Sequence, residues 1–245
     1  MIGIAIGLLS GTANAEKIHG ADEGCSIHID DDTVIFKGCN VQIISNGQEG
    51  SGNLIIGNNV PKVHDDRPEG TITGSHNVVV GDGHIVEGDL NLVTGHGNTV
   101  RSDRGAMIGS QYSELAGQYA AVVGGQSNAA RADLAAVVGG GGNTVHAYEG
   151  VAVGGANLSV GEADCAAEDC RNAVAVGGNS ARALGKHSVT VGGETNEASG
   201  ELATVLGGKG LDADDGQTRH GDDGCYTESL RWIGKVVVED CHEPK

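Results

Sequence analysis

Short apolar segments that end in glycine recur along most of this chain at a nearly constant spacing. The sequence Ala-Ala-Val-Val-Gly-Gly occupies residues 120–125 and returns at residues 135–140. With looser copies included, the glycines that end these segments stand at positions 57, 81, 95, 109, 124, 139, 154, 177, 192 and 207. The spacing is nearly uniform except between positions 57 and 81 and between positions 154 and 177, where the chain contains insertions near residues 58–70 and 161–171. A short fixed period of this kind is typical of a solenoid.

Each repeat holds two short stretches with different hydrophobic patterns. In the coil that follows Gly139, residues 143–147 alternate apolar and polar side chains, which predicts a strand with one dry face and one wet face. Residues 150–153 are apolar or glycine throughout, which predicts a strand buried on both faces. Glycine and asparagine at the corners allow the positive φ that a tight coil requires. The pattern therefore predicts an all-β fold: a parallel β-roll or β-solenoid of about ten 14–15-residue coils, two short strands per coil, capped at both ends.

The strand with two apolar faces raises the question of what covers its outer face. The interior of the coil covers one face, and no helix or second sheet of suitable size remains in the sequence to cover the other. Small apolar residues can face water singly, but a contiguous apolar stripe along many coils indicates an interface. We therefore expect identical chains to pack about an axis. The expected interface residues are Ala120, Val122, Ala135, Val137, Ala152, Ala203 and Val205, or the residues of the opposite parity.

Composition and charge narrow the possible partners. The 245 residues include 43 glycines but only one Phe, four Tyr and one Trp, which suits a narrow core repeated many times better than one large centre. The formal net charge of −18 excludes nucleic acid and anionic lipid surfaces as expected partners. Beyond the N-terminal residues, no segment reaches the ~20 apolar residues of a membrane-spanning helix.

The ends of the chain differ from the repeats. Residues 1–15 resemble a signal peptide, with an apolar run followed by Ala13-Asn14-Ala15, and they predict a secreted, extracellular or cell-surface protein. Residues 16–52 are expected to form an N-terminal cap segment, residues 53–210 the β-roll repeats, and residues 211–245 an acidic loop and a C-terminal cap.

Six cysteines fall into three local pairs, in the two caps and in the second insertion. Proximity predicts the disulfides Cys25–Cys39, Cys165–Cys170 and Cys225–Cys241. These are the places where a solenoid lacks repeat neighbours, so cross-links there would stabilise it. Metal binding by these cysteines is the alternative, which the absence of a Cys-x-x-Cys pair disfavours.

Few residues suggest catalysis or a cofactor. Asp212 and Asp214 are candidate calcium ligands, because Gly207-Gly-Lys-Gly210-Leu-Asp212 matches a calcium-binding glycine repeat. Such sites lie between tandem copies and only one copy is present, so a corner that runs into an acidic loop is favoured. His76, His84 and His96 lie near corners and are interpreted as surface residues. No nucleophile elbow, phosphate-binding loop or zinc-protease motif occurs, so no enzyme and no cofactor is expected.

One coil resembles the head repeats of YadA-like trimeric autotransporter adhesins. It runs Gly192-Gly-Glu-Thr-Asn196-Glu-Ala198-Ser-Gly200-Glu-Leu-Ala203-Thr-Val205, and residues 52–57 and 73–81 look like the same motif in uncharacterised secreted bacterial proteins. The resemblance covers roughly residues 50–210. It implies a left-handed β-roll, a homotrimer and a role in adhesion at a surface. Residues 211–245 show neither the heptad stalk nor the anchor strands of those adhesins, so attachment to a cell is not implied.

These observations predict a non-enzymatic, extracellular, adhesin-like or structural β-roll that self-associates as a trimer. Its expected ligand is a surface, matrix or glycan. The alternative is a β-solenoid that binds or cleaves polysaccharide, and the shortage of aromatic side chains for sugar stacking disfavours it.

Overall fold

A computed structural model describes residues 18–19, 26–30, 33–37, 40–45, 47–59, 62–64, 67–163, 170–220 and 226–228. Contacts divide the chain into two units, Met1–Ile44 and Ser45–Lys245. The predicted signal peptide (residues 1–15) lies outside the described residues, as do most of the proposed C-terminal cap and five of the six cysteines.

The described part of the first unit is a small antiparallel sheet. Strand β2 (Ser26–Asp30) pairs with β1 (Ile18–His19) on one side and with β3 (Thr33–Lys37) on the other. This segment is therefore a hairpin and not a coil of the solenoid, although its length is close to one repeat. Residues 40–45, which follow this sheet, form no strand.

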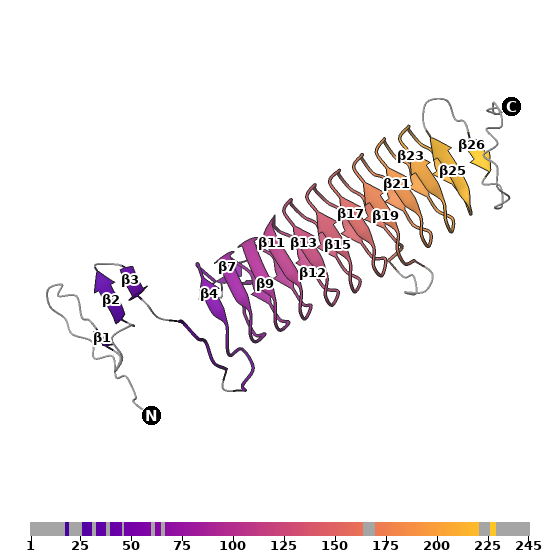
Figure 1. Cartoon of the computed structure of the whole chain (residues 1–245). Coiled ribbons are helices and arrows are strands. Elements are labelled where there is room, and N and C mark those ends of the chain that lie inside the picture. Colours follow the sequence, from indigo (N-terminus) through magenta and orange to yellow (C-terminus); the bar gives the residue numbers. More distant parts are fainter. Residues whose placement is uncertain are drawn as a thin grey trace. The chain divides into compact units, whose positions relative to one another are not determined.

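The second unit is the predicted β-solenoid, all-β and with about nine turns of two strands each (Figure 1). Its long sheet contains β4 (Leu54–Ile56), β7 (Val78–Asp82), β9 (Leu92–His96), β11 (Ala106–Gln111), β13 (Ala121–Val123), β15 (Ala136–Val138), β17 (Val151–Val153), β19 (Val174–Val176), β21 (Val189–Val191), β23 (Thr204–Leu206), β25 (Gln217–His220) and β26 (Tyr226–Glu228). Its short sheet contains β8 (Ile85–Val86), β10 (Thr99–Val100), β12 (Glu114–Leu115), β14 (Ala129–Ala130), β16 (Thr144–Val145), β18 (Ser159–Val160), β20 (Arg182–Ala183), β22 (Glu197–Ala198) and β24 (Asp212–Ala213). All pairs within the two sheets are parallel except β25 with β26.

One narrow core runs between the two sheets. From β7 to β23 each long-sheet strand points its second residue inward, as Val122 and Val137 do, and each short-sheet strand also points its second residue inward, as Ala130 and Val145 do. These side chains are fully buried, and nearly all are Ala or Val. Small side chains are enough to fill the core, because the two sheets lie close together. The expected dry and wet faces of the short-sheet strands are confirmed.

The paired glycines have two different roles at the corner after each long-sheet strand. Gly124 has a φ of 70° and open space beside its Cα, so its backbone conformation explains the residue. Gly125 also has a positive φ, but a Cβ there would overlap the Gly140 carbonyl oxygen and the Asn128 amide. The second glycine is therefore required by the close approach of the next coil.

An internal column of polar side chains joins successive coils at the same corner. The Oδ1 of Asn128 accepts the backbone N–H of Asn143 at 3.0 Å, and the Oδ1 of Asn143 accepts that of Leu158 at 2.9 Å. Their amides donate to corner carbonyls such as Gly154, at 2.7 Å from Asn143. We call this set the asparagine column; its members are His84, Asn98, Ser113, Asn128, Asn143 and, beyond a break at Leu158 and Ala181, Asn196. These asparagines are buried and do not have positive φ, contrary to the corner role expected for asparagine.

The repeat becomes longer at β11, and the cause is local. Met107 of β11 pairs with Val93 of β9, yet the next pairs are Ser110 with Gly95 and Gln111 with His96. One strand therefore has an additional residue, which is a β-bulge. Gly109 lies in this bulge with a φ of 63°, and its N–H donates to the Thr94 Oγ1 at 2.7 Å. Equivalent positions are accordingly closer in sequence before the bulge, as His84 and Asn98 are, than after it, as Asn128 and Asn143 are.

The insertions leave the parallel ladder intact. The first forms a hairpin of β5 (Lys62–His64) and β6 (Arg67–Glu69). Across the second, β17 still pairs in register with β19.

The repeats continue beyond residue 210, the end expected from the sequence, since β24 and β25 pair in parallel with the preceding turn. No helix in the described part of the chain is long and apolar enough to cross a membrane.

His84 is buried, although the sequence suggested a surface position. It occupies the asparagine column, where its Nδ1 accepts the N–H of Asn98 at 3.3 Å. The backbone N–H can only donate, so Nδ1 carries no proton and Nε2–H donates to the Val80 carbonyl, also at 3.3 Å. Burial is the main cause that lowers the pKa of His84 below its ordinary value of 6.5, and nearby His96 lowers it further, whereas Asp82 opposes the change.

We expect His84 to make the fold less stable in mild acid. A lowered pKa means that below pH 6.5 the unfolded chain binds the proton before the folded chain does. The contribution of neutral His84 to the free energy of unfolding should therefore be fully present above pH 6.5. It should fall as the pH drops below 6.5, by at most about 1.4 kcal/mol per pH unit for one proton. His84→Asn places the residue found in other coils there and should remove this component. Urea unfolding of both proteins from pH 7.5 to 5 measures the free energy of unfolding as a function of pH. If this free energy fell equally with pH in both proteins, the prediction would be contradicted.

Candidate self-association surface

The outward face of the long sheet carries an apolar stripe that no described part of the chain covers. In each three-residue strand the first and third residues point outward, so Val138 is 44% exposed beside Val137 at 0%. We call these outward residues the outer stripe. Its first column is Val78, Leu92, Ala106, Ala121, Ala136, Val151, Val174, Val189 and Thr204, and its second is Val80, Thr94, Ile108, Val123, Val138, Val153, Val176, Val191 and Leu206.

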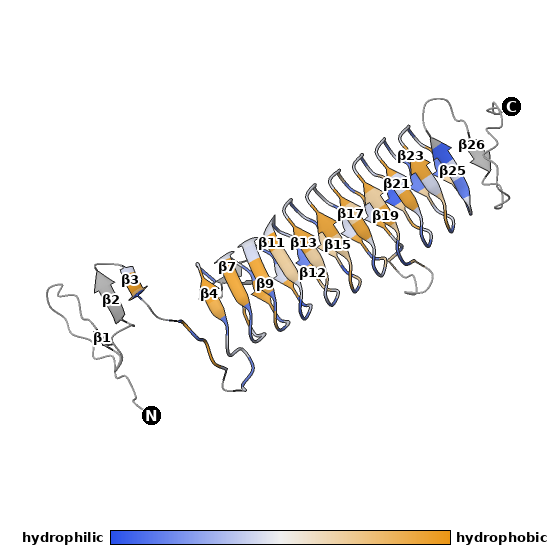
Figure 2. Cartoon of the chain, viewed as in Figure 1, coloured by the Kyte–Doolittle hydropathy of each residue, from blue (hydrophilic) through white to orange (hydrophobic). Residues whose placement is uncertain are grey.

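The outer stripe contains no Asp, Glu, Lys or Arg from β7 to β23, and Asp82 lies beyond it at the end of β7. In Figure 2 the strands of the long sheet form a mostly apolar row from β4 to β23, and the row ends at the hydrophilic β25. This absence of charge is notable in a chain with a net charge of −18. Contiguous exposed apolar surface of this length usually marks a binding surface.

The structure shows which of the two alternating sets of residues in the long-sheet strands faces outward. The seven named interface candidates, Ala120, Val122, Ala135, Val137, Ala152, Ala203 and Val205, are all buried in the core. The opposite parity, which the sequence left open, forms the outer stripe. The named residues are therefore corrected to core positions, and the candidate surface consists of their neighbours, such as Ala121, Val123, Ala136 and Val138.

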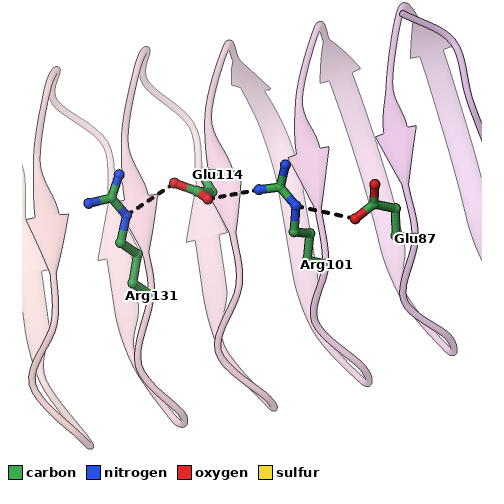
Figure 3. A network of polar contacts seen from close by, with 4 residues as sticks. All are labelled: Glu87, Arg101, Glu114 and Arg131. Carbon is green, nitrogen blue, oxygen red and sulfur yellow. Dashed lines mark hydrogen bonds and ion pairs between the residues drawn. The ribbon is translucent and has the colours of Figure 1, made fainter. Parts of the chain in front are cut away.

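The outward face of the short sheet has the opposite character. Four consecutive coils are linked there by ion pairs: Glu87 to Arg101 at 3.2 Å, Arg101 to Glu114 at 3.0 Å, and Glu114 to Arg131 at 3.1 Å (Figure 3). Farther along, Arg182 pairs with Glu197 at 2.8 Å. Exposed pairs of this kind stabilise by about 0.2–1 kcal/mol each. This face is wet and charged, so the long sheet is the better candidate for contact with another copy.

The remaining sequence candidates do not form a site. Asp212 accepts a hydrogen bond from the Ser199 hydroxyl at 3.1 Å, and Asp214 follows it at the end of β24. Among the described residues, no three His, Cys, Asp or Glu side chains are grouped to hold a metal ion. Cys170 is buried and disulfide-bonded, but Cys165 and the pairs Cys25–Cys39 and Cys225–Cys241 lie outside the described residues.

A polar hollow lies beside the second insertion. Its lining includes Glu162, Leu184, Lys186, Ser199 and Glu201. The Lys186 amine lies 3.9 Å from the Glu201 carboxylate, so these two charges partly neutralise each other. We assign this hollow no chemistry.

Comparison with protein-family models, with curated proteins and with solved structures found no match for this chain.

Proposed function

We propose that this chain is a non-enzymatic, extracellular β-solenoid that self-associates as a trimer and serves an adhesive or structural role. The observation that carries the proposal is the outer stripe, which is apolar along about nine turns and faces away from the core. The YadA-like resemblance, in which three β-rolls pack side by side, supports the number of copies and the adhesive role. The leader-like residues 1–15 and the disulfide at Cys170 support an extracellular location, since disulfides persist in oxidising compartments.

Charge and area both favour a second copy as the occupant of the outer stripe. Strongly acidic chains repel one another over most of their surface, so close approach is easiest where no carboxylate is present. About nine turns at about 4.8 Å each make the stripe about 45 Å long. The five residues from the preceding corner to the end of each strand, such as residues 134–138, span about 16 Å, so the strip covers roughly 700 Å² per copy, which is close to the ~800 Å² per partner of stable interfaces.

The mass in solution tests this proposal. Light scattering on the purified chain should give about three times the mass of one chain, which is 24.7 kDa. The mass should persist at raised salt, since an apolar interface is not weakened by screening. A mass near that of one chain at micromolar concentration would contradict the proposal and leave the outer stripe without an explanation.

A further inference from the structure

One corner of the solenoid holds large apolar side chains in an unfavourable backbone conformation. From β7 to β23, the corner before each long-sheet strand has one residue with positive φ, between 55° and 62°. We call this set the corner ridge; its members are His76, Leu90, Arg104, Tyr119, Leu134, Glu149, Asn172, His187 and Leu202. Four of the nine, Leu90, Tyr119, Leu134 and Leu202, are large apolar residues with between 42% and 60% of their surface exposed.

The fold does not require these residue types. Left-handed backbone favours Gly and Asn and disfavours residues with a large Cβ substituent. Asn172 occupies a ridge position, so asparagine is compatible with this corner. At the opposite corner, the equivalent position two residues before each short-sheet strand also has positive φ, and it is occupied mainly by glycine and small polar residues: Gly83, Gly97, Tyr112, Ser127, Gly142, Asn157, Ser180, Thr195 and Gly210. The ridge leucines and Tyr119 therefore carry both backbone strain and exposed apolar area that the opposite corner largely avoids.

Strain and exposure together suggest that these side chains are kept for a contact. The ridge is continuous with the outer stripe, because each ridge residue stands two positions before an outward residue, as Leu134 does before Ala136. Beside Tyr119 and Leu134 the first column of the stripe is narrow, since it consists of Ala106, Ala121 and Ala136. The surface thus presents large side chains next to a shallow alanine strip.

We propose that the corner ridge of one copy packs on the alanine-lined part of the outer stripe of a neighbouring copy. This inference rests on the proposed self-association and specifies which surfaces meet. A second copy fits because ridge and stripe both repeat once per coil, so side chains from successive coils match at every step. The contact joins two different surfaces, so each copy contributes a ridge to one neighbour and a stripe to the other. Such a contact between unlike surfaces forms a closed ring when the rotation between copies closes, as in a trimer, whereas two stripes face to face would stop at a dimer.

Ridge variants separate this contact from the fold. The double variant Leu134→Asn, Leu202→Asn should raise the dissociation constant of the oligomer roughly tenfold or more, because two large apolar side chains leave the interface. The matched control is Ser127→Asn, at a positive-φ position of the opposite corner, and it should leave the constant unchanged. Sedimentation equilibrium over a dilution series measures both.

A second measurement has the opposite expected sign. In a background that keeps copies apart, with Val138→Lys in the outer stripe, Leu134→Asn should raise the melting temperature, since we expect the relief of backbone strain to exceed the loss of the leucine's partial burial against its own chain. A lower melting temperature would show that Leu134 stabilises its own coil and would overturn the inference. An oligomer that is unaffected by the ridge variants but is dissociated by Val138→Lys would also overturn it, with the proposed function intact. A wild-type monomer would instead contradict the proposed function.

Discussion

The double variant Val123→Lys, Val138→Lys is expected to be a monomer. Both side chains lie in the second column of the outer stripe, in adjacent coils. In a single chain they are about two-fifths exposed, so lysines there would reach water and the fold should tolerate them within about 1 kcal/mol. In the oligomer the same lysines would lose their hydration without a partner, at several kcal/mol per ion. Light scattering should show the mass of one chain, and the β-type circular dichroism should be unchanged.

The control for this variant places the same charges on the other sheet. Thr144 and Ser159 are neighbours on the outward face of the short sheet, and they pair in register as Val123 and Val138 do. Thr144→Lys, Ser159→Lys should keep the wild-type mass, because we expect that face to remain in water. If both double variants dissociated, the outward face of the short sheet would take part in the association as well; if neither did, the outer stripe would not be the interface.

The period of the sequence was sufficient to predict the fold, but not the side of the strand that faces inward. The alternation at Ala130 and Val145 fixes the short sheet, since the residues beside them, such as Arg131, cannot be buried. In the long sheet both parities are Ala or Val, so hydrophobicity gives the same answer for Val122 and Val123. The corner decides between them, because it directs one parity toward the short sheet. No property of the two residues themselves carries that information.

The positive φ predicted for corner asparagines is confirmed at Asn157 and Asn172 but is wrong for the asparagine column. The tolerance of asparagine for positive φ suggested an exposed turn, whereas Asn128, Asn143 and Asn196 are buried and bond to the next coil. The need to satisfy backbone groups in a tight interior outweighs the conformational preference. A signal was present, because each of these residues stands four positions after the first glycine of its pair. Residues at exposed corners vary from coil to coil, as the corner ridge does.

His84 is identified by the period instead, since it stands one full period before Asn98. The end of the repeats was also predicted too early in the sequence, at residue 210. Asp212 is acidic, but it points outward from β24 while Ala213 fills the core position of the final short strand. The overall acidity of that segment concealed an alternation that continues the repeat.

The asparagine column should contribute more to stability than any surface contact of the solenoid. Asn143→Ala is expected to lower the free energy of unfolding by about 2–5 kcal/mol, because it leaves the Leu158 N–H and the Gly154 carbonyl without their side-chain partner in the interior. Urea unfolding in the Val123→Lys, Val138→Lys background measures this without a contribution from association. Asn179→Ala is the matched control, since the Asn179 side chain is exposed at a corner of the solenoid. This substitution should change the free energy of unfolding by less than about 0.5 kcal/mol. Equal effects of the two substitutions would show that water or a rearranged corner replaces the amide, and that the outward faces, not the internal column, hold successive coils together.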